Sequence, residues 1–212
     1  PKWISSHYSL LDLKYLNISP DVPEIKESIL QIAHNHKSVD GGVNPHRDYR
    51  GNPVSDMCIN GMFLNYACYF KVDESELKSV VDCIIQHQMP DGGFNCRINQ
   101  GGAVHSSLHT TISILEGLWV YKKNGYAYRV EELEKIAAES REFILMHRLY
   151  KSDKTGEIIN KKFTMLSYPS RWFYNILRAL DYFQFAGVDY DPRMQDALDV
   201  LMKKRRKDGT WP

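Results

Sequence analysis

The chain repeats one turn motif at nearly regular spacing, and this repeat restricts the fold more than any other feature. The intervals between the aspartates of successive copies are 51, 62 and 55 residues. Periods of this length are typical of stacked helical hairpins. The copies are VDGGV at 39–43, PDGGFN at 90–95, the weaker DKTGE at 153–157, and KDGTW at 207–211.

Each copy of the motif follows a segment with a single apolar face, as expected of a half-exposed helix. These segments begin with N-terminal signals such as Pro23-Glu24, and the Asp-Gly pair is predicted to end them because glycine accepts a left-handed conformation. The sequence therefore predicts four outer helices, at about 24–37, 74–88, 130–147 and 192–206.

A second set of helical segments alternates with the first. These segments are apolar on more than one stripe, which predicts burial on several sides. Aligned in register, they begin at His7, Asp56, His109 and Arg171. The alternation predicts an all-α fold, either an α/α toroid, partial or complete, or an α-solenoid, built from inner and outer helices in hairpins. We expect residues 1–212 to form one such domain of about four hairpins, an open arc or a fragment of a longer chain.

The composition excludes several classes of partner. With 212 residues, 43% hydrophobic content and a formal net charge of +1, the chain can bury a core and shows no overall sign of nucleic-acid binding. The basic run at 203–207 is interpreted as a solvated helix end. No apolar run approaches the ~20 residues of a membrane span. We expect a small-molecule substrate, and nothing in the sequence indicates a partner chain.

Four cysteines are present without the regular spacing of a disulfide framework. Cys68 and Cys83 fall inside helical patterns and are interpreted as small core residues. Reduced thiols predict a cytoplasmic location.

The register of the inner helices predicts a metal site. Because these helices run in the same direction, their first residues should gather at one mouth of the central cavity. Asp56, Cys58 and His109 would then supply carboxylate, thiolate and imidazole ligands, which zinc prefers, with a fourth position open. The alternative is that Asp56 caps a helix, Cys58 packs in the core and His109 makes a buried hydrogen bond.

Further polar and aromatic residues precede the inner helices and are candidates for the same mouth. His7, His105 and Arg171 are predicted to act on the substrate, and His7 is also a possible fourth ligand. Cys96 is a spare ligand candidate. The alternatives are a solvated loop for the polar residues and core packing for the aromatic ones. The predicted substrate-binding residues are Arg47, Arg50, Tyr168 and Trp172.

These motifs resemble the repeats of terpenoid cyclases and protein prenyltransferases. The glycine turns QHQMPDGGFN and MKKRRKDGTW, the pair Asp56-Met57-Cys58 and His109-Thr110, and LEGL at 115–118 carry the resemblance, which extends over most of the chain. In prenyltransferase β-subunits the matching Asp, Cys and His bind zinc, which activates a substrate thiol. The resemblance therefore implies an α/α toroid and zinc at Asp56, Cys58 and His109.

The chain also departs from this family. Arg50 matches the family's arginine, but Pro53 and Ile59 stand where a lysine and a tyrosine are found, so we do not expect ordinary protein prenylation. The Asp-x-Asp-Asp motif of the cyclases is absent from the sequence.

The sequence thus predicts a zinc-dependent enzyme that acts on a small isoprenoid or thiol substrate in a central cavity, with the metal as Lewis acid or thiol activator. Two alternatives stay open: a metal-free cyclase-like or carbohydrate-active enzyme on the same fold, and a non-catalytic binding module.

Overall fold

The computed structural model describes residues 5–45, 54–96 and 101–211, and within these ranges the chain is helical. Two isolated bridges, Lys37 with Val43 and Lys151 with Ile158, are the β contacts of the described residues, which contain no β-strand. The all-α prediction is confirmed. The α-helices are α1 (Ser6–Tyr15), α2 (Pro23–Asn35), α3 (Met57–Tyr69), α4 (Glu74–Gln86), α6 (Leu108–Lys123), α7 (Val130–Met146), α8 (Ile176–Phe185) and α9 (Gln195–Lys204), with short 3-10 helices η2 (Lys161–Thr164) and η3 (Pro192–Met194).

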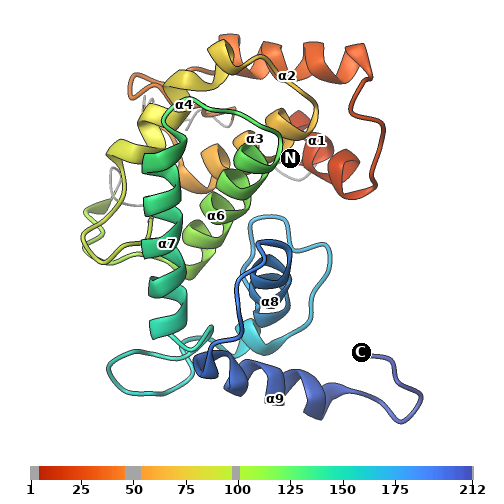
Figure 1. Cartoon of the computed structure of the whole chain (residues 1–212), viewed down its shortest axis with the longest axis vertical. Helices are drawn as coiled ribbons and strands as arrows, with labels where there is room; N and C mark the ends of the chain where they lie inside the picture. Colours follow the sequence, from red (N-terminus) through yellow and green to blue (C-terminus); the bar gives the residue numbers. More distant parts are fainter. Residues whose placement is uncertain (1–4, 46–53, 97–100, 212) are drawn as a thin grey trace.

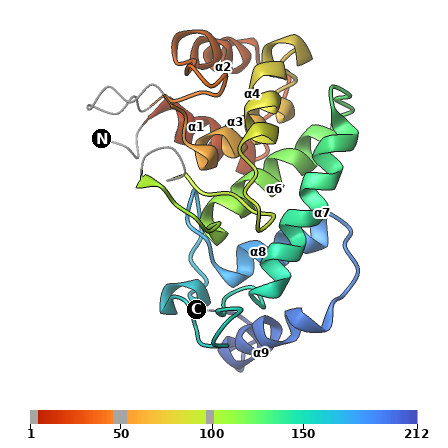
Figure 2. The ribbon, with the colours of Figure 1, turned by 90° about the vertical axis from the view of Figure 1, so that its left-hand side faces the viewer.

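The helices pair along the chain and form two series. Helices α1, α3, α6 and α8 contact one another in that order, and α2, α4 and α7 each pack on the helix that precedes them. Helix α2 lies at one end of the long axis and α9 at the other, with α1 and α8 between them (Figures 1 and 2). This is an array of alternating inner and outer helices, whereas the toroidal arrangement, partial or complete, stays a prediction. No helix in the described ranges has the length and apolar character needed to cross a membrane.

Burial separates the inner helix α3 from the outer helix α4, as the sequence pattern predicts. In α3, 11 of 13 residues are buried, whereas in the outer helix α4 only five of 13 are. The inner helices α3 and α6 approach so closely that a Cβ atom added at Gly61 would lie 2.4 Å from the carbonyl oxygen of Ser113. A Cβ at Gly117 would lie 2.5 Å from the carbonyl oxygen of Gly61. Only glycine permits this contact between backbones.

The Asp-Gly motifs form turns, but they do not end the helices. Helices α2 and α4 end at Asn35 and Gln86, and their C-cap residues are His36 and His87. The glycines with positive φ, Gly41 and Gly92, lie five residues beyond each C-cap in a separate tight turn. Helices α2 and α4 therefore end within two residues of the predicted positions, but the Asp-Gly pairs are not what ends them.

The first two turns are held in the same way. The Asp40 carboxylate accepts hydrogen bonds from the backbone N–H and the hydroxyl of Ser55, at 3.0 and 2.9 Å. The Asp91 carboxylate accepts the corresponding pair from Ser106, whose backbone N–H lies at 2.8 Å. Each aspartate thereby connects the turn after an outer helix to the start of the next inner helix.

These equivalent contacts correct the predicted register of the inner helices. Helices α3 and α6 begin at Met57 and Leu108, so the structural equivalent of His109 is Cys58. The sequence alignment had paired His109 with Asp56, because it matched the apolar positions three and six residues later and did not match helix starts. Arg171 was also expected to open an inner helix, but α8 begins at Ile176.

Candidate functional site

Three side chains with metal-binding atoms meet beside the first Asp-Gly turn. Asp40 lies in the turn after α2, Cys83 in the last turns of α4, and His87 at the C-cap of α4. One ligand atom from each lies within 4.8 Å of the others. Cys83 is buried, and Asp40 and His87 are half-buried. This group could hold a metal ion, and it is a different Asp-Cys-His set from the predicted one.

The protonation of His87 leaves one ring nitrogen for a ligand. Its Nδ1 atom lies 2.8 Å from the carbonyl oxygen of Cys83, four residues earlier. A carbonyl only accepts hydrogen bonds, so Nδ1 carries the proton and Nε2 keeps its lone pair. Zinc-binding histidines usually donate their second ring nitrogen to such a carbonyl or to a carboxylate.

The thiol of Cys83 lies close to His87 and to Ser55. Its Sγ atom lies 3.7 Å from Nδ1 of His87 and 3.5 Å from Oγ of Ser55, which also donates to Asp40. Burial raises the pKa of the Cys83 thiol to about 12. Without a metal the sulfur is therefore protonated at pH 7.

The next repeat has the same scaffold without a thiol. His147 is the C-cap of α7, and its Nδ1 lies 2.8 Å from the carbonyl oxygen of Phe143. Phe143 occupies the place of Cys83, four residues before the histidine. The histidine contact is therefore a repeated way to end an outer helix, and the cysteine is what distinguishes the Asp40 group.

Two of the predicted metal ligands lie at the start of α3. Asp56 is the N-cap residue, without a side-chain capping bond, and Cys58 is the second residue of the helix. The backbone N–H of Cys58 donates to Sγ of Cys96 at 3.1 Å. Interaction with the Cys58 side chain lowers the pKa of the Cys96 thiol, although desolvation acts in the opposite direction. The spare ligand candidate Cys96 therefore lies next to Cys58.

The third predicted ligand, His109, faces an aromatic cluster. Its ring lies 5.1 Å from the ring of Trp172 and 4.8 Å from that of Phe173, centroid to centroid. Its Nδ1 accepts the backbone N–H of Tyr174 at 2.9 Å, so the proton of the neutral ring is on Nε2. Burial, with the Arg178 cation acting in the same direction, lowers the pKa of His109 to about 4. The role of His109 as a metal ligand stays a prediction. This role requires loss either of the hydrogen bond from the Tyr174 backbone N–H or of the proton on Nε2.

Three residues that the sequence predicted at the mouth of the central cavity lie near Tyr8 in α1. The guanidinium of Arg171 lies over the Tyr8 ring, 5.7 Å from its centroid, and pairs with Asp12 at 3.1 Å. Burial raises the pKa of the Tyr8 phenol, and Cys58 and Asp56 are close enough to act on it electrostatically. His7 is buried, with Nδ1 3.1 Å from the Tyr66 hydroxyl. The structure thus brings Asp56, Cys58 and Arg171 into one neighbourhood.

The other predicted residues are more dispersed. His105 is exposed, and Tyr168 is 76% exposed. Arg47 and Arg50 lie outside the described residues. The Asp40 group was missed because Asp40 was interpreted as a turn residue and Cys83 as core. A cysteine four residues before a helix-terminal histidine is the signal that could have found it.

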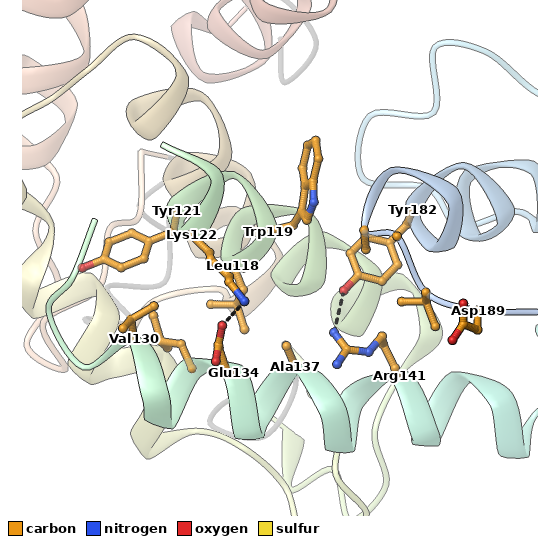
Figure 3. Close-up of a pocket in the computed structure, with 14 residues that line it drawn as sticks. Leu118, Trp119, Tyr121, Lys122, Val130, Glu134, Ala137, Arg141, Tyr182 and Asp189 are labelled. Carbon is orange, nitrogen blue, oxygen red and sulfur yellow. Dashed lines mark hydrogen bonds and ion pairs between the residues drawn. The ribbon is translucent and has the colours of Figure 1, made fainter. Parts of the chain in front are cut away.

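A cleft of about 550 Å³ opens between α6, α7 and the end of α8 (Figure 3). Its walls include Leu118, Leu133 and Val188, and Arg141 donates to the Tyr182 hydroxyl at 3.4 Å. Lys122 and Glu134 form an ion pair across it. None of the residues of the Asp40 group lines this cleft.

No protein-family model matches the chain, and neither a curated protein nor a solved structure matches it significantly. The resemblance to cyclases and prenyltransferases therefore depends on the sequence motifs alone.

Proposed function

We propose that this chain is a zinc-dependent enzyme whose metal is held by Asp40, Cys83 and His87. The observation that supports the proposal is the approach of three ligand atoms of these residues to within 4.8 Å of one another. Carboxylate, thiolate and imidazole are together a donor set that suits zinc better than magnesium or calcium, which prefer oxygen ligands.

The surroundings of the group fit a zinc ion. We assign the ligand role to Nε2 of His87, because Nδ1 donates to the carbonyl oxygen of Cys83. Ser55 orients the Asp40 carboxylate through two hydrogen bonds before any metal arrives. The Cys83 thiol must lose its proton on binding, and a divalent cation offsets the cost of burying the thiolate beside Asp40.

The enzymatic part of the proposal depends on coordination chemistry and on the motif resemblance. A zinc ion with three protein ligands keeps a fourth position for water or substrate and acts there as a Lewis acid. The half-exposed side chains of Asp40 and His87 leave the group within reach of solvent. The substrate class expected from the motifs is a small thiol or isoprenoid.

Metal analysis of the purified chain tests the proposal. We expect one zinc per chain, measured by elemental analysis after dialysis, and at least a 10-fold weaker affinity in Cys83→Ser and His87→Gln. His147→Gln is the matched control, because His147 ends α7 as His87 ends α4 but has no neighbouring thiol. It should bind zinc as the unsubstituted chain does.

Two further variants separate this site from the one predicted by the motifs. Cys58→Ser and His109→Gln should leave zinc binding unchanged if the Asp40 group holds the metal. Loss of zinc in these two, with zinc retained in Cys83→Ser, would move the metal to the start of α3. No zinc uptake by any folded form would remove the zinc-enzyme proposal altogether.

A further inference from the structure

Cys58 and Cys96 form a pair of neighbouring thiols from two parts of the chain. Cys58 is the second residue of α3, and Cys96 lies in the connection between α4 and α6. The backbone N–H of Cys58 donates to Sγ of Cys96 at 3.1 Å, and the two side chains are close enough to interact. The two cysteines are therefore neighbours at the N-terminus of an inner helix.

The surroundings of Cys96 fix the position of its sulfur. The atom lies at the N-terminus of α3, where it accepts the backbone N–H of Cys58. The Thr110 hydroxyl, from the start of α6, lies 3.4 Å away on another side. Three contacts from two helices thus hold one sulfur in place.

Exposure separates this pair from the other two cysteines. Cys58 and Cys96 are partly exposed, whereas Cys68 and Cys83 are buried. An oxidant in solution can therefore reach the pair and not the buried thiols. Oxidation is selective for thiols that combine thiolate character with access.

We propose that Cys58 and Cys96 are a redox modification site, at which a peroxide converts two thiols into one intramolecular disulfide. The Cys96 thiolate attacks the peroxide, the O–O bond breaks, and an alcohol or water leaves after taking up a proton. The resulting Cys96 sulfenic acid is attacked by Cys58, the S–S bond forms, and water leaves with the Cys58 proton. The sulfurs lose two electrons in all, and the peroxide gains them.

The site is distinct from the proposed zinc group, which uses a different cysteine. A disulfide here would tie the start of α3 to the connection that leads into α6. The proposal therefore holds or fails independently of zinc at Asp40, Cys83 and His87.

The experiment treats the folded chain, free of metal, with hydrogen peroxide and then alkylates the remaining thiols. We expect a species lighter by two hydrogens, with Cys68 and Cys83 available for alkylation only after unfolding and with full reversal by dithiothreitol. Trypsin leaves Cys58 with Cys68 and Cys83 with Cys96 in shared peptides. Chymotrypsin, which can cut after Tyr66 and Phe94, is therefore added before the cross-link is mapped.

Single substitutions give the decisive comparison. Cys58→Ser should trap Cys96 as a sulfenic or sulfinic acid, and Cys96→Ser should slow reaction with peroxide by about 10-fold. Cys83→Ser is the control and should form the cross-link as before, provided its circular dichroism shows a folded chain. Cross-links spread over several cysteine pairs, or full alkylation of Cys58 and Cys96 after peroxide, would overturn the proposal.

Discussion

At the scale of single residues, Arg178 is buried and forms an ion pair with Glu116. Two parallel hydrogen bonds of 2.7 Å join the guanidinium to the carboxylate. Arg178 also donates to the carbonyl oxygen of Phe173 and to the Ser113 hydroxyl, at 3.1 and 3.2 Å. The pair thus connects α8 to α6 beside His109, and the buried Arg178 cation depends on Glu116 for a compensating charge.

Breaking the ion pair of Arg178 and Glu116 should lower the free energy of unfolding. We expect Glu116→Gln to lower the free energy of unfolding by about 3–5 kcal/mol, because it leaves the Arg178 cation buried without compensation. Asp21→Asn, which removes an exposed pair with Lys71, should cost less than about 1 kcal/mol. Urea unfolding at pH 7 measures both. Equal effects would mean that water reaches Arg178 freely.

The pH dependence of stability should depend in part on Glu74. Its carboxylate accepts backbone N–H bonds from Tyr128 and Ala127, at 2.8 and 2.6 Å, and these bonds lower its pKa below the usual 4.5. Since the folded-state pKa is the lower one, the stabilisation is complete above pH 4.5 and is lost as the pH falls further.

Glu74→Gln should therefore lower stability at pH 7 and flatten the decline between neutral pH and pH 3. Urea midpoints across that range are the measurement, with the exposed Glu27→Gln as control. A Glu74→Gln profile parallel to that of the unsubstituted chain would show that the carboxylate does not contribute.

At the scale of helices, the close contact of α3 with α6 determines how the inner layer packs. Alanine normally favours a helix over glycine by about 1 kcal/mol. At Gly61 and Gly117 the sign should reverse, because a Cβ would lie 2.4 or 2.5 Å from a backbone oxygen of the facing helix.

We expect Gly61→Ala and Gly117→Ala each to destabilise the chain by about 1–3 kcal/mol, as overpacking does. The exposed Gln31→Ala in α2 is the control and should be neutral or slightly stabilising. Unfolding in urea measures all three. A gain in stability at either glycine would mean that the two helices can move apart at little cost.

At the scale of the whole molecule, the sequence predicted the array of hairpins well and the candidate site poorly. Local patterns determine the outer helices, so the predicted range 74–88 corresponds to Glu74–Gln86 in the structure. The meeting of Asp40 with Cys83 joins residues 43 positions apart through packing, and no local pattern encodes it. Arg171 was expected at the start of an inner helix, but it lies before α8, which begins at Ile176, and it contacts Tyr8 from there.

The contacts between Asp40 and Ser55, and between Asp91 and Ser106, have a consequence for how such a chain can evolve. Each joins two points 15 residues apart, and Asn44 and Asn95 add a second bond inside each span, to the carbonyl oxygens of Val54 and His105. The ends of each span are thereby fixed whatever lies between them. Doubling the length of the enclosed segment costs only about 0.6 kcal/mol. New residues, and with them new specificities, can be inserted at these two places while the helices keep their positions.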